Sequence, residues 1–444
     1  MSKKQNITQE LLKKFQKAYD KDPANRIVEN AISGVGIDQS AMNPKAIKRH
    51  TWIFSNETEQ GEPTDQKKSG RCWYFASLNT LRQIVMKKLN VESFEFSETH
   101  LFFYDQLEKA NTFLEHIIRT ADRDILDREV QIIFNGAIYD GGYWEYFVPL
   151  CLKYGLIPKS EGPETFHSGD TYMFSKQMDL RLRQKAMEMR KAKKDGKGED
   201  DLRKMKNDVL SDIYNIAVKA LGEPVQEFSF AYRDKDKNFH RLDKMTPVEF
   251  FEKYVGKDEL DKRVNICADP RTDKPTGRWL KIDNVRSVFE APPAGSYNVP
   301  LEVYAESVLA SLKDGTPVWF ACDVGKDINR KLGILDHELY EYELILPALG
   351  DFDKEARFLS DYSSPTHAMN ITGVDLDADG NPLCWRVENS WGEEMGKKGT
   401  FSMSHQWFLE YAYEAIIDLK YLPEKWHEGL KEEPIYLEPW EKLA

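Results

Sequence analysis

The residues whose chemistry stands out first are Cys72 and Gln66. Apolar residues recur at helical spacing from Trp73 to Leu89, so the thiol is expected at the N-terminus of a helix. Unpaired backbone N–H groups and the positive end of the helix dipole favour the thiolate there, which is the nucleophilic form of cysteine. Gln66 lies six residues upstream, so its amide and the Cys72 N–H could both donate to a developing oxyanion. The pattern favours a nucleophile over a buried structural cysteine beside a surface glutamine.

A thiol nucleophile needs a base, and His367 is the histidine whose setting suits that role. It opens an apolar, strand-like run, and Asn389 follows at the end of the next such run. A hairpin formed by the two runs would place Asn389 beside His367, where its side-chain carbonyl could fix the imidazole tautomer. Trp391 could cover that hydrogen bond and keep water out. Alone, each residue is more simply a core histidine or a turn asparagine; the order Gln, Cys, His, Asn favours a catalytic set.

Helical patterns precede strand-like patterns along the chain, and this order sets how the candidate residues are positioned. Helical periodicity is found in residues 7–19, 72–89, 97–118, 143–154 and 300–313, with one or two surface helices expected between 171 and 222. Strands are predicted at 317–322, 367–374, 383–387 and 399–403. A polar stretch without a predicted element separates the first helix from Gln66. The order predicts an α+β enzyme with two lobes and a cleft between them.

Length and charge limit the kinds of protein that this chain can be. With 444 residues it exceeds one ordinary core, so two or three packed units are expected. Its 62 basic and 74 acidic residues give a formal net charge of −12, which disfavours a nucleic-acid partner. The first residues lack the apolar region of a signal peptide, and no stretch approaches the roughly 18 apolar residues of a membrane helix. We therefore expect a cytoplasmic protein without membrane association.

The cysteines and one acidic run bear on whether a metal is bound. Five cysteines are scattered without a CxxC pair, so neither a disulfide framework nor a zinc site is expected. The run that begins Asp375-x-Asp377-x-Asp379-Gly380 resembles the start of a calcium loop, but its twelfth position is Arg386 rather than an acid. A hairpin turn is the better interpretation, and neither a metal nor an organic cofactor is predicted.

The sequence around Cys72 resembles the papain-like cysteine peptidases. The segment Ser69–Trp73 follows that family's C-G-[SA]-C-[WY] signature, with a serine where secreted members have a disulfide cysteine and an arginine in place of Ser or Ala. The missing cysteine fits a reducing compartment. The resemblance implies that Cys72 is the nucleophile, His367 the base, Asn389 the orienting residue and Gln66 the oxyanion donor.

The same resemblance implies a cleft for extended peptide. The segment Ile138–Trp144 looks like the family's Gly-Gly segment, in which the backbone of Gly141 and Gly142 pairs with substrate because no side chain blocks the peptide. Trp391 is counted with these glycines as a residue of the substrate cleft.

The spacing of the motifs indicates which group of papain-like peptidases the chain resembles. Cys72 and His367 are 295 residues apart, against roughly 130–150 for papain and the cathepsins, so a large insertion is implied. With Val-Glu-Asn-Ser-Trp-Gly near its end, the chain is similar to the bleomycin hydrolase and aminopeptidase C family. The expected division is an N-terminal extension (1–60), a helical catalytic lobe (61–170), a mainly helical insertion (171–290), a β-rich catalytic lobe (291–430) and a C-terminal arm (431–444).

That family implies a homohexamer whose active sites face an internal chamber and whose C-terminal arm lies in the cleft. The carboxylate of Ala444 would then hold the free amino group of a short peptide, which makes the enzyme an aminopeptidase. Only four residues follow Trp440, and a short arm would leave subsites open for an endopeptidase or oligopeptidase. Two further hypotheses are an acyltransferase that uses the same triad and a non-catalytic scaffold. The intact set of four residues disfavours the scaffold.

Overall fold

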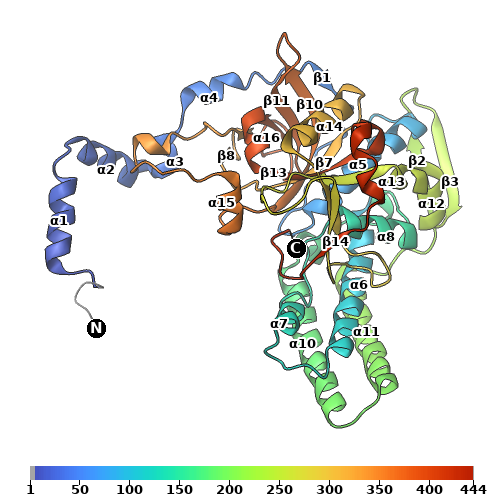
Figure 1. The fold of residues 1–444 in the computed structure, drawn as a ribbon. Helices are drawn as coiled ribbons and strands as arrows, with labels where there is room; N and C mark the ends of the chain where they lie inside the picture. Colours follow the sequence, from blue (N-terminus) through green and yellow to red (C-terminus); the bar gives the residue numbers. More distant parts are fainter. Residues whose placement is uncertain (1–5, 444) are drawn as a thin grey trace.

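A computed structural model describes residues 6–443, in which a body of helices and sheet carries two projections (Figure 1). One projection is formed by the N-terminal helices, and the other is the helical hairpin of α10 and α11, which packs on α6. The helices up to this hairpin are α1 (Gln9–Tyr19), α2 (Ala24–Val35), α3 (Ile37–Ala41), α4 (Pro44–Arg49), α5 (Cys72–Leu89), α6 (Glu98–Arg119), α7 (Arg128–Asn135), α8 (Trp144–Tyr154), α9 (Phe166–Gly169), α10 (Tyr172–Lys194) and α11 (Glu199–Leu221). The helices that follow are α12 (Pro247–Tyr254), α13 (Lys257–Asp261), α14 (Leu301–Lys313), α15 (Lys354–Leu359) and α16 (His405–Tyr411).

The strands form one twelve-stranded mixed sheet and a separate hairpin. The sheet contains β1 (Asn56–Glu57), β4 (Arg263–Cys267), β5 (Arg278–Ile282), β6 (Gly295–Asn298), β7 (Val318–Cys322), β8 (Ile328–Asn329), β9 (Ile334–Leu335), β10 (His367–Leu376), β11 (Pro382–Glu388), β12 (Thr400–Ser404), β13 (Ala412–Asp418) and β14 (Ile435–Leu437). The separate hairpin is formed by β2 (Phe228–Arg233) and β3 (Phe239–Met245). Along the main sheet the order is β14-β5-β6-β4-β13-β7-β10-β11-β12-β9-β8, with β1 paired to β10.

Buried side chains form two large clusters, which correspond to the two predicted lobes. One is built mainly from α5, α6, α8, α10, α11 and α12, and the other from β7, β10 to β13, α14 and α16. Trp319 on β7 and Ala368 on β10 pack into the helical cluster, so these two strands face the helical lobe. The expected α+β architecture of a helical lobe and a β-rich lobe is therefore observed.

Several predicted elements occur with close bounds, and one segment does not match its prediction. The helices expected at 72–89, 97–118, 143–154 and 300–313 are α5, α6, α8 and α14, and the four predicted strands are β7, β10, β11 and β12. The stretch expected to be polar and without elements before Gln66 instead contains α2, α3 and α4. Amphipathic spacing was present in α2, whose apolar side chains remain exposed in the single chain.

The division into five segments at 60, 170, 290 and 430 stays a prediction. The helices α10 to α13 lie within 171–290, but so do the strands β2 to β5, of which β4 and β5 pair with strands of the main sheet. No helix in residues 6–443 is long and apolar enough to cross a membrane.

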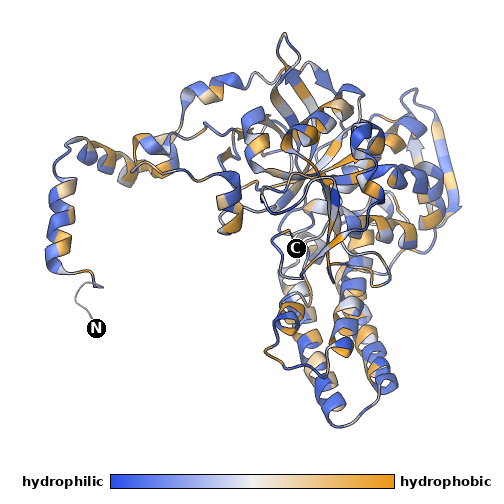
Figure 2. Ribbon diagram, in the orientation of Figure 1, coloured by the Kyte–Doolittle hydropathy of each residue, from blue (hydrophilic) through white to orange (hydrophobic). Residues whose placement is uncertain are grey.

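The N-terminal helices stand apart from the rest of the molecule. α1 and α2 contain no buried residue, and Figure 2 shows apolar residues along both helices where they extend away from the body. Phe15, Ile27 and Val35 are 53%, 72% and 62% exposed. These two helices therefore have apolar faces that the subunit itself does not cover.

Candidate active site

Cys72 is the first residue of α5, as the sequence predicted, and its helix is fixed in the core. Thirteen residues of the helix are buried, beginning with Trp73. The preceding residue, Arg71, is fully buried, and its guanidinium donates to both carboxylate oxygens of Glu164, at 2.7 and 3.2 Å. The nucleophile loop is thus held from behind by an ion pair, while the half-buried thiol stays at the helix N-terminus.

His367 and Asn389 meet through the predicted hairpin. His367 opens β10, Asn389 directly follows β11, and the two strands pair antiparallel. The His367 Nε2 and the Asn389 Oδ1 are 2.9 Å apart. Because an amide oxygen can only accept, this contact requires the proton of the neutral imidazole to sit on Nε2, which leaves Nδ1 as the acceptor. Burial lowers the pKa of His367 to about 4, although the hydrogen bond to Asn389 opposes that shift.

One buried asparagine ties the helix of Cys72 to the strand of His367. Asn370 on β10 donates from Nδ2 to the Ala76 carbonyl of α5 at 2.8 Å, and its Oδ1 accepts from the Thr80 hydroxyl at 2.7 Å. A buried ion pair between Arg82 of α5 and Glu388 of β11 adds a second link. These contacts fix the two lobes against each other directly beneath the site.

Gln66 lies on the loop that leads to Cys72 and is held on two sides. Its Oε1 accepts from the Ser390 hydroxyl at 2.7 Å, and its Nε2 donates to the Ser69 carbonyl at 2.6 Å. Its own backbone N–H donates to the Ser390 carbonyl at 2.8 Å. A primary amide has two N–H groups, so one remains for the cavity that Gln66 lines.

Trp391 lies against the ring of His367, as expected from the sequence. The two ring centroids are 5.0 Å apart, and the Arg330 guanidinium lies 4.7 Å from the centroid of the Trp391 ring. The indole therefore shields the imidazole side of the His367–Asn389 bond. Trp391 is not among the residues that line the main cavity in the described part of the chain.

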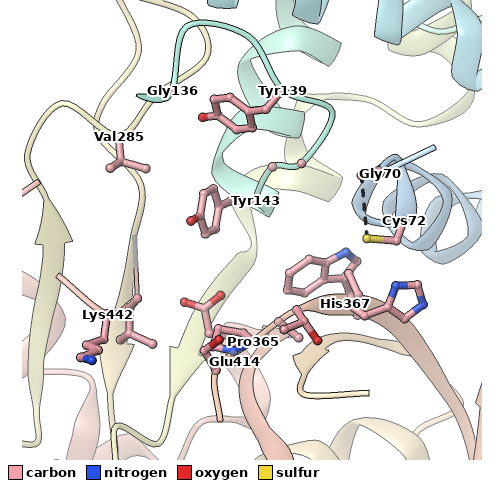
Figure 3. Close-up of a pocket in the computed structure, with 18 of the residues that line it drawn as sticks. Gly70, Cys72, Gly136, Tyr139, Tyr143, Val285, Pro365, His367, Glu414 and Lys442 are labelled. Atoms are coloured by element: carbon pink, nitrogen blue, oxygen red, sulfur yellow. Dashed lines mark hydrogen bonds between the residues drawn. The ribbon is translucent and has the colours of Figure 1, made fainter. Parts of the chain in front are cut away.

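Cys72, His367 and Gln66 line one cavity of about 660 Å³ (Figure 3). Gly141 and Gly142 form part of its wall, as predicted. A Cβ on Gly142 would lie 2.5 Å from the Trp73 ring, so glycine is required for this close approach.

The glycine segment is anchored through its backbone. The Trp73 indole donates to the Asp140 carbonyl at 2.8 Å, and the Lys109 ammonium donates to the Gly141 carbonyl at 2.6 Å. The Asp140 carboxylate in turn accepts from the Gly70 N–H at 3.1 Å, next to the nucleophile. A fixed backbone of this kind can pair with an extended peptide at little cost in entropy.

The C-terminal arm reaches the same cavity. β14 adds to the sheet edge beside β5, Leu443 is 5% exposed, and Pro439, Lys442 and Leu443 belong to the cavity wall. The Arg128 guanidinium lies 4.1 Å from the centroid of the Trp440 ring. Ala444, the predicted anchor for the substrate amino group, lies outside the described residues.

Burial and the nearby backbone N–H groups shift the pKa of the Cys72 thiol in opposite directions. Burial raises the pKa of Cys72, while the nearby N–H groups of Ala368 and Trp73 and its own N–H lower it. With the His367 imidazole neutral, the resting pair contains a thiol and a free acceptor nitrogen. Both groups line the same cavity, and a thiol that comes within hydrogen-bond distance of a neutral imidazole can pass its proton to it as sulfur attacks a carbonyl.

One acidic residue of the cavity wall was missed by the sequence reasoning. Glu414 on β13 lines the cavity, and its carboxylate is drawn among the cavity side chains in Figure 3. A single acid within the apolar run from Ala412 to Ile417 was a signal that could have found it. Among residues 6–443, no group of three or more His, Cys, Asp or Glu side chains is placed to hold a metal ion.

Comparisons with known proteins cover nearly the whole chain. The sequence model of the Peptidase C1-like family matches residues 6–444. Aminopeptidase C of Streptococcus thermophilus is 36% identical over 439 residues, which are 99% of this chain and 98% of that protein. Aminopeptidase G of Lactobacillus delbrueckii subsp. lactis is 37% identical over 438 residues, which are 99% of each. The crystal structure of PepW from Lactobacillus rhamnosis superposes with a TM-score of 0.95 at 36% identity and covers 98% of both chains.

Proposed function

The chain belongs to the Peptidase C1-like family and is a cysteine-type peptidase, and from this premise we propose that it acts as an aminopeptidase on short peptides. The family match and the full-length relatives confirm the resemblance stated from the sequence and, with it, the papain-like α+β fold. The observation that carries the proposal is the C-terminal arm, whose Lys442 and Leu443 line the cavity that contains Cys72 and His367.

The chemistry follows from the placement of four side chains. Cys72 Sγ attacks the substrate carbonyl carbon as its proton passes to His367 Nδ1. The Cys72 N–H and the free N–H of Gln66 donate to the oxyanion, and Asn389 holds the imidazolium through Nε2. The imidazolium then protonates the leaving amine, and water, activated by His367, hydrolyses the thioester.

An arm whose Lys442 and Leu443 line the cavity limits which peptides can bind. It occupies space that the N-terminal part of a longer peptide would need, so only a residue with a free amino group fits ahead of the cleaved bond. Removal of single N-terminal residues is the expected result. Aminopeptidase C and aminopeptidase G are the names of the full-length relatives, which supports this specificity.

The specificity is tested with matched fluorogenic peptides that carry a free or an acetylated N-terminus. The reduced enzyme should hydrolyse the free amine and leave the acetylated peptide intact. Efficient hydrolysis of the acetylated peptide would contradict exopeptidase action.

The catalytic roles are tested by two substitutions measured on the free-amine substrate. Cys72→Ala should abolish turnover, with a loss of at least about 10³-fold in kcat. Asn389→Ala should lower kcat by roughly 10²-fold, because the imidazole loses its orientation, while KM changes little. Retention of full activity in Cys72→Ala would reject the cysteine mechanism for this site.

The volume of the cavity supports endopeptidase or oligopeptidase action as a second candidate. About 660 Å³ remains open beside Leu443, which is within the size range of sites that enclose an extended ligand. In that case the acetylated peptide is the better substrate, so the same assay separates the two candidates.

We also propose that the subunits assemble, with a homohexamer as the expected state, in the cytoplasm. The uncovered apolar faces of α1 and α2 support assembly, because large exposed apolar patches mark interaction surfaces. All five cysteines are free in the structure, which suits a reducing compartment.

Assembly is tested by light scattering coupled to size-exclusion chromatography. The combined substitution Phe15→Asp and Ile27→Asp should lower the mass per particle toward that of one chain. Lys14→Gln on the same helix is the matched control and should leave the assembly intact. A monomeric wild-type protein would contradict the proposal.

A further inference from the structure

Glu414 is a buried acid on the wall of the cavity that contains Cys72. It is 5% exposed and belongs both to the main cavity and to a small neighbouring pocket closed by Leu437 and Leu443 of the arm. In the view of Figure 3 its carboxylate lies between the side chains of Tyr143 and Lys442, which also line the cavity. A carboxylate at this place must either remain protonated or meet a positive group.

A second acid lies behind the first. Glu145, in the first turn of α8, lines the same small pocket, and its Oε1 accepts from the Asn265 amide at 2.9 Å. Its Oε2 is buried without a hydrogen-bond partner. Each acid disfavours ionisation of the other, since two like charges cannot both be desolvated cheaply.

Lys281 on β5 favours ionisation of Glu145 through its charge but forms no ion pair with it. Within residues 6–443 no Lys, Arg or His forms an ion pair with Glu145 or Glu414. Lys442 also lines the main cavity, but its ammonium is paired with Asp361. Burial raises the pKa of Glu414 to about 8 and that of Glu145 to about 7, and the charge of Glu145 adds to the shift of Glu414.

We infer that Glu414, backed by Glu145, forms a cation-accepting subsite that selects peptides carrying a positive group next to the cleaved bond. The inference rests on the proposed peptidase function and deepens it. The positive group is an ammonium or guanidinium, supplied either by the free α-amino group or by a Lys or Arg side chain of the preceding residue. Either source would supply the ion-pair partner that Glu414 does not find within residues 6–443.

Two pairs of coumarin amides separate the sources. In the first pair, leucyl amide is compared with 4-methylpentanoyl amide, which lacks only the α-amino group. In the second pair, acetyl-lysyl-leucyl amide is compared with acetyl-norleucyl-leucyl amide, which lacks only the side-chain ammonium. The measured quantity is the ratio of kcat/KM between the charged and the neutral member of each pair.

Glu414→Gln should reduce the ratio of at least one pair by about 10- to 100-fold, the range for a buried charged hydrogen bond, while kcat/KM of the neutral member changes less than about twofold. A reduced ratio in the first pair identifies the α-amino group, and one in the second identifies the side chain. Glu145→Gln should keep or increase the ratio, because removing the second acid makes Glu414 easier to ionise. A purely structural role of Glu414 would lower both members of a pair equally.

Glu424→Gln is the matched control, because Glu424 is an exposed carboxyl outside the cavity and its removal should leave all ratios unchanged. Unchanged ratios in Glu414→Gln would overturn the inference while the peptidase function stands. Failure of the wild-type enzyme to hydrolyse any of the four amides would overturn the proposed function and the inference with it. Glu414→Asp, which keeps the charge, should retain part of the ratio and controls for folding.

Discussion

Two clusters of buried charge flank the cavity and differ in whether their charges are balanced. Behind Cys72, Arg71 pairs with Glu164 at 2.7 Å, and Lys159 bridges Glu164 at 3.0 Å and Glu98. We call these four residues the paired cluster. Beside the arm, Glu145 and Glu414, which we call the acid pair, form no ion pair with a Lys, Arg or His of residues 6–443.

The charges of the paired cluster stabilise the fold, whereas we expect the acid pair to be stabilised when a ligand supplies a positive group. Burial alone would raise the pKa of Glu164, but Arg71 and Lys159 lower it to about 2, so the folded state stabilises its ionised form. Burial and mutual repulsion act in the same direction on the acid pair, so the folded state disfavours its ionised form. Proteins retain such unfavourable groups chiefly where function needs them.

The largest effect should come from breaking the paired cluster. Arg71→Met leaves the half-buried Glu164 with Lys159 as a remaining ion-pair partner, and the loss of hydrogen bonds to a charged group costs about 1.5–3 kcal/mol. The free energy of unfolding, measured by urea denaturation at pH 7, should fall by this order. A loss below about 1 kcal/mol would mean that the cluster does not hold the nucleophile loop.

The acid pair should produce a smaller effect of opposite sign. The pKa of Glu414 is raised to about 8 in the folded state from an ordinary value near 4.5, so its contribution to stability is present below 4.5 and is lost as pH rises toward 8. Glu414→Gln removes that loss and should stabilise the protein by about 2 kcal/mol at pH 9 and by almost nothing at pH 5. Thermal unfolding of both proteins across this range checks the trend, and a gain that is equal at both pH values would refute the linkage.

The smallest effect is expected for an ion pair that is not buried. Lys257 and Asp261 pair along one exposed helix turn, with side chains 57% and 49% exposed. Lys257→Met should change the free energy of unfolding by only about 0.3–0.5 kcal/mol. If Lys257→Met lowered the free energy of unfolding as much as Arg71→Met, burial would not explain the difference between exposed and buried ion pairs.

The sequence predicted the groups that lie in local motifs. Cys72, His367 and Asn389 could be found because each stands at the boundary of a periodic segment, where helix and strand bounds are readable from the pattern. Gln66 was found from its place six residues before Cys72 on the incoming loop. The predicted hairpin was enough to place His367 beside Asn389, and in the structure the two side chains lie within hydrogen-bond distance.

Features that depend on long-range packing could not be found in this way. Glu145 lies on α8 and Glu414 on β13, and only the joining of the two lobes brings them to one pocket. β4 and β5 lie within a tract that composition marks as helical, and their pairing to the main sheet is a property of the whole fold. α2 was missed although its apolar residues have amphipathic spacing, because the stretch around it was judged by its polar composition.

The ties made by Asn370 also decide how the enzyme can move. Since this one amide holds α5 and β10 together, the thiol and the imidazole belong to a single cooperative unit of the fold. Their backbone amides should therefore become accessible to hydrogen exchange in the same opening event.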